Sequence, residues 1–180
     1  MSRLPIIEPA DAQAPAADLL AAVRKALGVT PNMTKVMANS PAVLKGYLEF
    51  SGALAGGRLP AKVREAIALA VAQENACDYC LSAHTHIATS LAGLTPAEAA
   101  AARRAESADA RTHAALTLAA ALVRTRGEVA DTDLKAAREA GLDDAEVAEV
   151  IANVALNVFT NYFNKAAAVD IDWPEVSHLS

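Results

Sequence analysis

Both cysteines of this 180-residue chain, and two of its four histidines, lie in one short stretch, ENACDYCLSAHTHIA. Two residues separate Cys77 from Cys80, and His84 and His86 follow within six residues of the second cysteine. Such a group suits a redox-active dithiol, a metal site, or two small apolar residues in a core. In a reducing compartment, a Cys-x-x-Cys pair is more often a redox or metal site than a permanent structural disulfide.

The helices around the cysteines determine which side chains can join them. One helix is expected over residues 60–75, and the next begins close to Cys77. If the two fold back antiparallel, Glu65 and His84 lie at about the same level, because each is about ten residues from the turn. Cys80 and His84, four residues apart, share a face, and the two cysteines are close enough for a disulfide. The hairpin therefore gathers a carboxylate, an imidazole and two thiols.

These groups have complementary roles in thiol chemistry. A thiol becomes a nucleophile when it loses its proton, and a helix N-terminus or a neighbouring base favours the thiolate. His84 can take the proton of Cys80, directly or through water, while Glu65 orients the imidazole. The Cys80 thiolate would attack a peroxide oxygen to give a sulfenic acid, and Cys77 would condense with it to a disulfide. An external dithiol would then restore the pair.

The spacing of these four residues resembles the signature of AhpD-like alkylhydroperoxidases in the carboxymuconolactone decarboxylase superfamily. Eleven residues separate Glu65 from Cys77, and three separate Cys80 from His84. The flanking ENACDYCLSAHTHIA and the later NVFTNYFNKAAAVDID are also similar to that family. Tyr79 stands where the best-known members have a histidine, and this difference suggests the peroxidase-related branch.

The resemblance implies an all-helical fold, a homo-oligomer (a trimer or a hexamer) and an enzyme that reduces organic hydroperoxides. It further implies that Cys80 is the cysteine that attacks the peroxide and that Cys77 resolves the sulfenic acid. Glu65 and His84 would form the proton relay.

Other interpretations of the motif stay open. A zinc site would use both cysteines with His84 and His86, but two histidines two residues apart point in different directions on a helix. The cysteines could also be small core residues. A decarboxylase or lactone-acting enzyme of the same superfamily would need no thiol, and a non-catalytic redox sensor would oxidise the pair without turnover. The presence of both cysteines argues against the non-thiol enzyme, and Glu65 and His84 at matching spacing argue against a plain core pair. We predict no metal and no organic cofactor.

Composition limits the class of protein. Hydrophobic residues make up 53% of the chain but aromatic residues only 4%, so alanine and leucine, both good helix formers, carry the apolar content. The net charge of -5 argues against a nucleic-acid partner. No apolar run is long enough for a membrane span, and the N-terminal stretch does not have the form of a signal peptide. We expect a cytoplasmic enzyme. Its substrate would be a hydroperoxide, its reductant an external dithiol, and it would assemble with copies of itself.

Proline, glycine and capping residues divide the chain into about eight helices of one domain over residues 1–180, with no strand. An extended arm is expected at 1–14 and an irregular tail at 170–180. The turn before the cysteines is expected at Asn75, which tolerates left-handed conformations. Thr95 and Glu98 predict a capping box. Helical segments are expected over 15–27, within 30–41, and over 41–55, 60–75, 77–93, from 96, and over 109–126, 131–140 and 143–169.

Further polar residues are expected around the site. Tyr79 is predicted to form part of the pocket wall and to donate one hydrogen bond through its hydroxyl. His86 is predicted to lie at the pocket rim or in a contact between subunits. The last helix carries asparagines at steps of four, four and three, a polar row on one face. We expect this row in a subunit interface, or, through Asn157 or Asn161, in the pocket. The row consists of Asn153, Asn157, Asn161 and Asn164.

Overall fold

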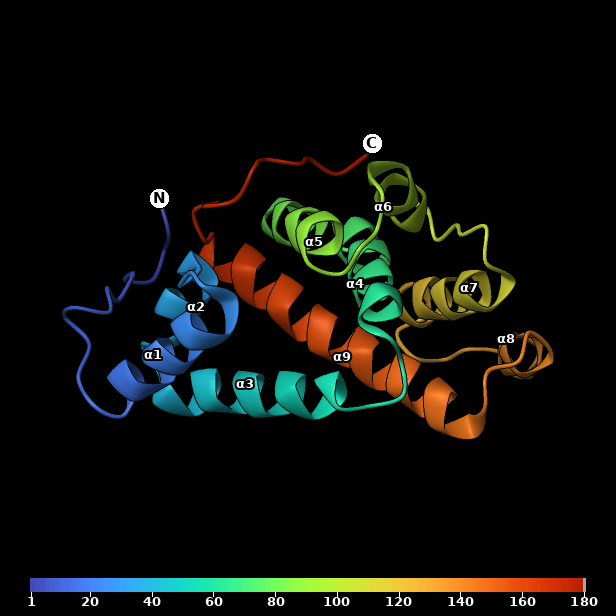
Figure 1. The fold of residues 1–180 in the computed structure, drawn as a ribbon, viewed down its shortest axis with the longest axis horizontal. Coiled ribbons are helices and arrows are strands. Elements are labelled where there is room, and N and C mark those ends of the chain that lie inside the picture. The colour runs from blue at the N-terminus through green and yellow to red at the C-terminus, as the bar shows by residue number, and fades with distance from the viewer. Residues whose placement is uncertain (180) are drawn as a thin grey trace.

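The computed structural model, which describes residues 1–179, contains nine α helices and, within those residues, no strand (Figure 1). The all-helical fold is as predicted. Each of the expected helical segments forms one helix, including the short α2 and α6. The helices are α1 (Ala16–Leu27), α2 (Asn32–Met37), α3 (Pro41–Ala55), α4 (Ala61–Glu74), α5 (Asp78–Ser90), α6 (Pro96–Ala102), α7 (Ala110–Arg124), α8 (Asp131–Glu139) and α9 (Asp144–Ala167).

Helix α4 forms the centre of the core. Its residues Ala66 to Ala72 are buried without interruption, so the helix has no solvent-facing side over nearly two turns. It packs against α5, α7 and α9, and more weakly against α6 (Figure 1). Alanine supplies four of these seven residues, and its small side chain lets the neighbouring helices approach closely. Because α4 is enclosed, residues at its first turns have fixed positions relative to α5 and α9.

The turn between α4 and α5 differs from the prediction in one residue. Asn75 keeps a right-handed conformation, and Ala76 takes the left-handed one, with φ 48°. The amide N–H of Cys77 donates to the carbonyl of Ala72, and the N–H of Ala76 donates to that of Gln73, which together make a Schellman motif. The Asn75 side chain instead donates to Asn161 Oδ1 at 2.9 Å, so its tertiary contact takes precedence over its turn preference.

Helix α9, about 36 Å long at 24 residues, crosses the whole molecule beneath α4 and α5 (Figure 1). Asp143 and Glu146 cap its N-terminus reciprocally. The capping box predicted from Thr95 and Glu98 is present at the start of α6. Within residues 1–179, no helix is long and apolar enough to cross a membrane.

The two terminal segments pack on the same end of α9. Arg3 N–H donates to the carbonyl of Ala167 at 2.7 Å, and the terminal amine of Met1 lies 2.8 Å from Asp170. The C-terminal tail then runs over α5 and ends beside α6 (Figure 1). His178 contacts Asp78 at the start of α5, which attaches the tail close to the cysteines.

Candidate active site

Cys77 and Cys80 form a disulfide at the start of α5, with their Cα atoms 5.3 Å apart. Cys77 is the N-cap residue of the helix, and its sulfur accepts a hydrogen bond from the amide of Cys80 at 3.4 Å. Both cysteines are almost completely buried, at 1% and 2% exposed. The positive end of the helix dipole lies at these sulfurs and favours a thiolate after reduction.

Glu65 and His84 face each other across the α4–α5 hairpin, as their spacing predicted. Glu65 Oε2 lies 2.8 Å from His84 Nδ1, and both side chains are about one-fifth exposed. A carboxylate can only accept in this hydrogen bond, so Nδ1 is the donor, and in the neutral imidazole the lone pair is then on Nε2. His84 is thereby oriented as a base on the side away from Glu65.

A cavity of about 200 Å³ joins the disulfide to this pair. Its wall comes from α1 to α5, from α9 and from the C-terminal tail, so six helices and one irregular segment contribute to it. Of the two cysteines, only Cys80 lines the cavity. The apolar part of the wall includes Leu27, Met33, Ala68, Ala83, Ile87 and Leu156, and the polar part includes Tyr47, Arg64, Glu65, Tyr79, His84, Asn153, Asn157 and Asn164.

Asn164 touches the sulfur that faces the cavity. Its Nδ2 lies 3.2 Å from Cys80 Sγ and 3.3 Å from Met33 Sδ, so the amide donates toward two sulfur atoms. Its Oδ1 is buried and has no hydrogen-bond partner among the described residues, although the residue is only 3% exposed. A buried acceptor without a partner is costly, and the residue that carries this one lies on the cavity wall, where a bound molecule could pair with it.

The asparagine row of α9 faces the interior of its own chain, and all four side chains are buried. Asn153 and Asn157 donate to carbonyls one turn earlier and line the cavity. Asn161 does not line the cavity, because its side chain is directed to Asn75 in the α4–α5 turn. The row therefore divides between the pocket wall and support of the hairpin.

Tyr79 of α5 forms a second wall of the cavity, and the C-terminal tail holds its hydroxyl in place. The Tyr79 hydroxyl donates to Asp172 Oδ1 at 2.9 Å, and it accepts from the Met33 amide at 3.1 Å and from Trp173 Nε1 at 3.4 Å. Burial, together with the nearby charge of Asp172, raises the pKa of Tyr79 well above its usual value. The phenol therefore stays protonated and donates to Asp172 at neutral pH. This agrees with the prediction that Tyr79 forms part of the pocket wall and donates one hydrogen bond.

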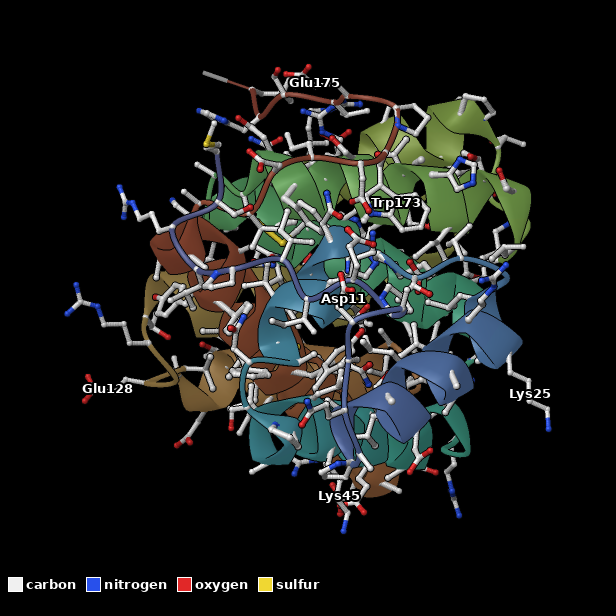
Figure 2. All side chains as sticks on the ribbon, turned by 90° about the vertical axis from the view of Figure 1, so that its left-hand side faces the viewer. Asp11, Lys25, Lys45, Glu128, Trp173 and Glu175 are labelled. Carbon is white, nitrogen blue, oxygen red and sulfur yellow. A yellow bond between two sulfur atoms is a disulfide. The ribbon has the colours of Figure 1, made fainter. Side chains whose placement is uncertain are left out.

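Trp173 lines the cavity and packs on His86, with ring centroids 5.4 Å apart. It lies on the inner side of the tail, whereas Glu175 lies at the outer edge (Figure 2). His86 is exposed and does not line the cavity, so it acts on the pocket only through the tryptophan ring.

Tyr47 brings a further hydroxyl to the cavity from α3. Desolvation, with a smaller contribution from the charge of Glu65, raises the pKa of Tyr47 to about 12. The phenol remains protonated at neutral pH and is a donor available to a bound molecule.

Several of these residues carry no local sequence signal. The period of α9 places Asn164 in the asparagine row but gives no reason for a contact with a cysteine, and no motif points to Arg64, Asp172 or Trp173. Their contacts with the site span up to 94 residues, so no helical period links them to the motif. Within residues 1–179, no three His, Cys, Asp or Glu side chains gather in a way that could hold a metal ion.

The segment from α3 to α7, residues 41–123, matches the Carboxymuconolactone decarboxylase family. The whole fold is similar to a peroxidase-related protein from Silicibacter sp. TM1040, at 25% identity and a TM-score of 0.82 over 94% of this chain and 91% of that one. The family match and this likeness in fold support membership of the AhpD-like carboxymuconolactone decarboxylase superfamily.

Two other solved structures share this fold. One is an alkylhydroperoxidase AhpD core protein from Ralstonia eutropha JMP134, with 23% identity, a TM-score of 0.74, and 95% and 92% of the two chains covered. The other is a cysteine-to-alanine variant of the debrominase Bmp8 in complex with 2,3,4-tribromopyrrole, with 20% identity, a TM-score of 0.78, and 96% and 94% covered. No curated protein sequence matches the chain.

Proposed function

We propose that this protein is a thiol-dependent peroxidase that reduces organic hydroperoxides with the Cys77–Cys80 pair. The observation that carries the proposal is the shared cavity. One sulfur of a redox-capable pair and an oriented histidine–carboxylate pair open into the same small space. The disulfide corresponds to the oxidised state of the catalytic cycle, in which the pair awaits reduction.

The cycle begins with the reduced pair. His84 takes the Cys80 proton, and the thiolate attacks the terminal oxygen of the hydroperoxide. The O–O bond breaks, Cys80 becomes a sulfenic acid, and the alkoxide takes the proton from His84 and leaves as an alcohol. Cys77 then attacks the Cys80 sulfur and water leaves, which gives the disulfide. An external dithiol supplies two electrons and two protons and restores both thiols.

The surrounding residues have separate roles in this scheme. Glu65 holds the imidazole with Nε2 as the base, and the Asn164 amide stabilises the Cys80 thiolate by hydrogen bonding. Tyr47 is available to donate to the alkoxide oxygen as it forms. The apolar wall accommodates the alkyl or aryl group of the hydroperoxide.

The test is reduction of cumene hydroperoxide by the fully reduced protein, followed by intact mass and thiol count. We expect the wild type to lose two thiols and two mass units per turnover and to cycle with excess dithiothreitol. Cys77→Ser should stop at a sulfenic acid on Cys80, which dimedone traps. Glu65→Gln and His84→Ala should slow peroxide attack by about 10² or more. Survival of both thiols in excess peroxide would overturn the proposal.

The other interpretations give different results in the same experiment. A redox sensor would be oxidised once and would not cycle with the reductant. A decarboxylase or lactone-acting enzyme would keep its activity in a Cys77→Ser, Cys80→Ser double variant, since acid–base chemistry needs no thiol.

A second candidate activity is reductive debromination of a small aromatic ring. The similarity to the debrominase Bmp8 in complex with 2,3,4-tribromopyrrole supports it. In balanced form, the dithiol would supply two electrons, the ring carbon would exchange bromine for hydrogen, and hydrogen bromide and the disulfide would result. Bromide release from 2,3,4-tribromopyrrole by the reduced protein, and its absence in Cys80→Ser, would favour this activity.

We also propose that the chain acts as a homo-oligomer. The exposed side of α9 carries Ile151, Phe159 and Tyr162, and α3, which packs on α9, exposes Phe50. Large apolar side chains in this arrangement are typical of surfaces that bind other protein chains. Light scattering coupled to gel filtration should give a mass above 18.6 kDa, and Phe159→Asp should lower it toward the monomer.

A further inference from the structure

The cavity contains one permanent cation. Of the twenty residues that line it, Arg64 is the only lysine or arginine, and Glu65 is the only aspartate or glutamate. The Glu65 carboxylate is already bonded to His84. Arg64 is therefore the charge in the wall that remains for a bound molecule.

The guanidinium of Arg64 has few contacts within its own chain. Its one hydrogen bond among the described residues is from Nη1 to the carbonyl of Leu59, at 2.5 Å. No carboxylate of residues 1–179 lies within ion-pair distance of it. The nearby Glu149 accepts the amide N–H groups of Arg58 and Leu59 instead. Most of the five N–H donors of Arg64 are free, and the side chain is half-buried at the cavity wall.

Arg64 and the reactive sulfur lie at different levels of the cavity. Glu65 is level with His84, which is four residues, or about 6 Å along the helix, from Cys80. Arg64 precedes Glu65 on α4 and so lies farther from the α4–α5 turn and from the sulfur. The side chains of Ala68, Ala83 and Ile87 form apolar wall in this part of the cavity.

We propose that this cavity selects hydroperoxides that carry a carboxylate, and that Arg64 binds the carboxylate while the O–O bond lies at Cys80. This inference rests on the proposed peroxidase function and names its substrate class. The planar guanidinium matches a carboxylate in two parallel hydrogen bonds, and partial burial strengthens the pairing. A molecule with an acidic group, an apolar body and a hydroperoxide at the other end satisfies all three regions of the wall.

A matched pair of substrates tests the selection: cumene hydroperoxide and the same compound with a carboxylate at ring position 4. We expect kcat/KM of the wild type to be about tenfold or more higher for the acid. Arg64→Gln should reduce the acid-to-neutral ratio to near one. Arg58→Gln is the control, because it removes the same charge outside the cavity, where Arg58 pairs with Asp143. A wild-type ratio near one, or a ratio unchanged in Arg64→Gln, would overturn the inference.

A binding measurement separates this inference from the peroxidase proposal. Calorimetric titration of the disulfide form with 4-isopropylbenzoate and with its neutral amide requires no turnover. We expect the benzoate to bind at least tenfold more tightly than the amide, and Arg64→Gln to abolish the difference. If that result holds in a protein that reduces no hydroperoxide, the anion site stands and the peroxidase proposal fails. If hydroperoxides are reduced but the benzoate has no advantage, the anion site fails.

Discussion

Asn164 is the residue that links the far end of the chain to the proposed nucleophile. Its amide lies 3.2 Å from Cys80 Sγ, and its carbonyl oxygen is buried without a hydrogen-bond partner in residues 1–179. A neutral disulfide sulfur gains little from this donor, whereas a thiolate gains a hydrogen bond to a charged acceptor. The contact therefore favours the reduced, ionised cysteine over the thiol.

We predict that Asn164→Ala lowers the reactivity of Cys80 at neutral pH about tenfold, because loss of a hydrogen bond of about 1.5 kcal/mol reduces the thiolate fraction. The measurement is iodoacetamide alkylation in a Cys77→Ser background, as the ratio of the rate at pH 7 to the alkaline plateau. That ratio cancels any change in access. Asn153→Ala, on the same helix but bonded to the Glu149 carbonyl, should leave the ratio unchanged. An equal ratio in both variants would show that Asn164 has no effect on the thiolate.

The α4–α5 hairpin is the element that assembles the site. The Schellman motif that ends α4 and the N-cap that begins α5 overlap at Cys77, so one short turn sets the position of both cysteines. The left-handed residue in this turn is Ala76, and a Cβ atom is unfavourable in that conformation. The turn therefore holds a strained alanine where glycine is the common residue.

We predict that Ala76→Gly stabilises the protein by about 1 kcal/mol, because glycine adopts the left-handed region without steric cost. Thermal unfolding should show a rise of about 2–4 °C. Ala70→Gly, the same substitution inside α4, should destabilise by about 1 kcal/mol or more, since glycine weakens a helix interior. A fall in the melting temperature of Ala76→Gly would mean that Ala76 is not strained.

At the scale of the whole molecule, the C-terminal tail closes one side of the cavity. Trp173 lines it, Asp172 bonds the Tyr79 hydroxyl, and His178 binds Asp78 through both its backbone N–H and its ring. Burial alone would raise the pKa of Asp78, but the hydrogen bonds from His178 outweigh this and hold the pKa below its ordinary value. Asp78 therefore accepts the hydrogen bonds from His178 most strongly when its carboxyl group is ionised.

The sign of the pH dependence follows from that shift. Because the pKa of Asp78 is lower with the tail docked, docking is fully favoured above the ordinary aspartate pKa of about 4 and is lost as the pH falls below it. Trp173 is the only tryptophan of the chain, so its fluorescence reports tail docking directly. We predict a red shift of its emission as the pH falls below about 4.

Asp78→Asn should show this red shift already at pH 7 and should lose the acid transition. Asp11→Asn, which removes an exposed carboxylate from the N-terminal arm, serves as the control and should behave like the wild type. An acid transition of equal size in Asp78→Asn would assign it to another group.

The sequence by itself determined the helical class, most helix boundaries and the group formed by Glu65, Cys77, Cys80 and His84. These features depend on residues that are close together in the chain. Over such short distances, proline and glycine set where helices end, and the helical period sets which side chains share a face. The fold-back of α4 on α5 extends that reach to the nineteen-residue separation of Glu65 and His84.

Only the tertiary structure decided what surrounds this group. Asn164 meets Cys80 across 84 residues, and Trp173 meets Tyr79 across 94. The tertiary packing places Asn161 against the hairpin rather than in the cavity, and within the described part of the chain it leaves Arg64 in the wall without an acidic partner. Such contacts depend on how α9 and the tail pack on α4 and α5. That packing is a property of the whole core, and no local pattern of residues encodes it.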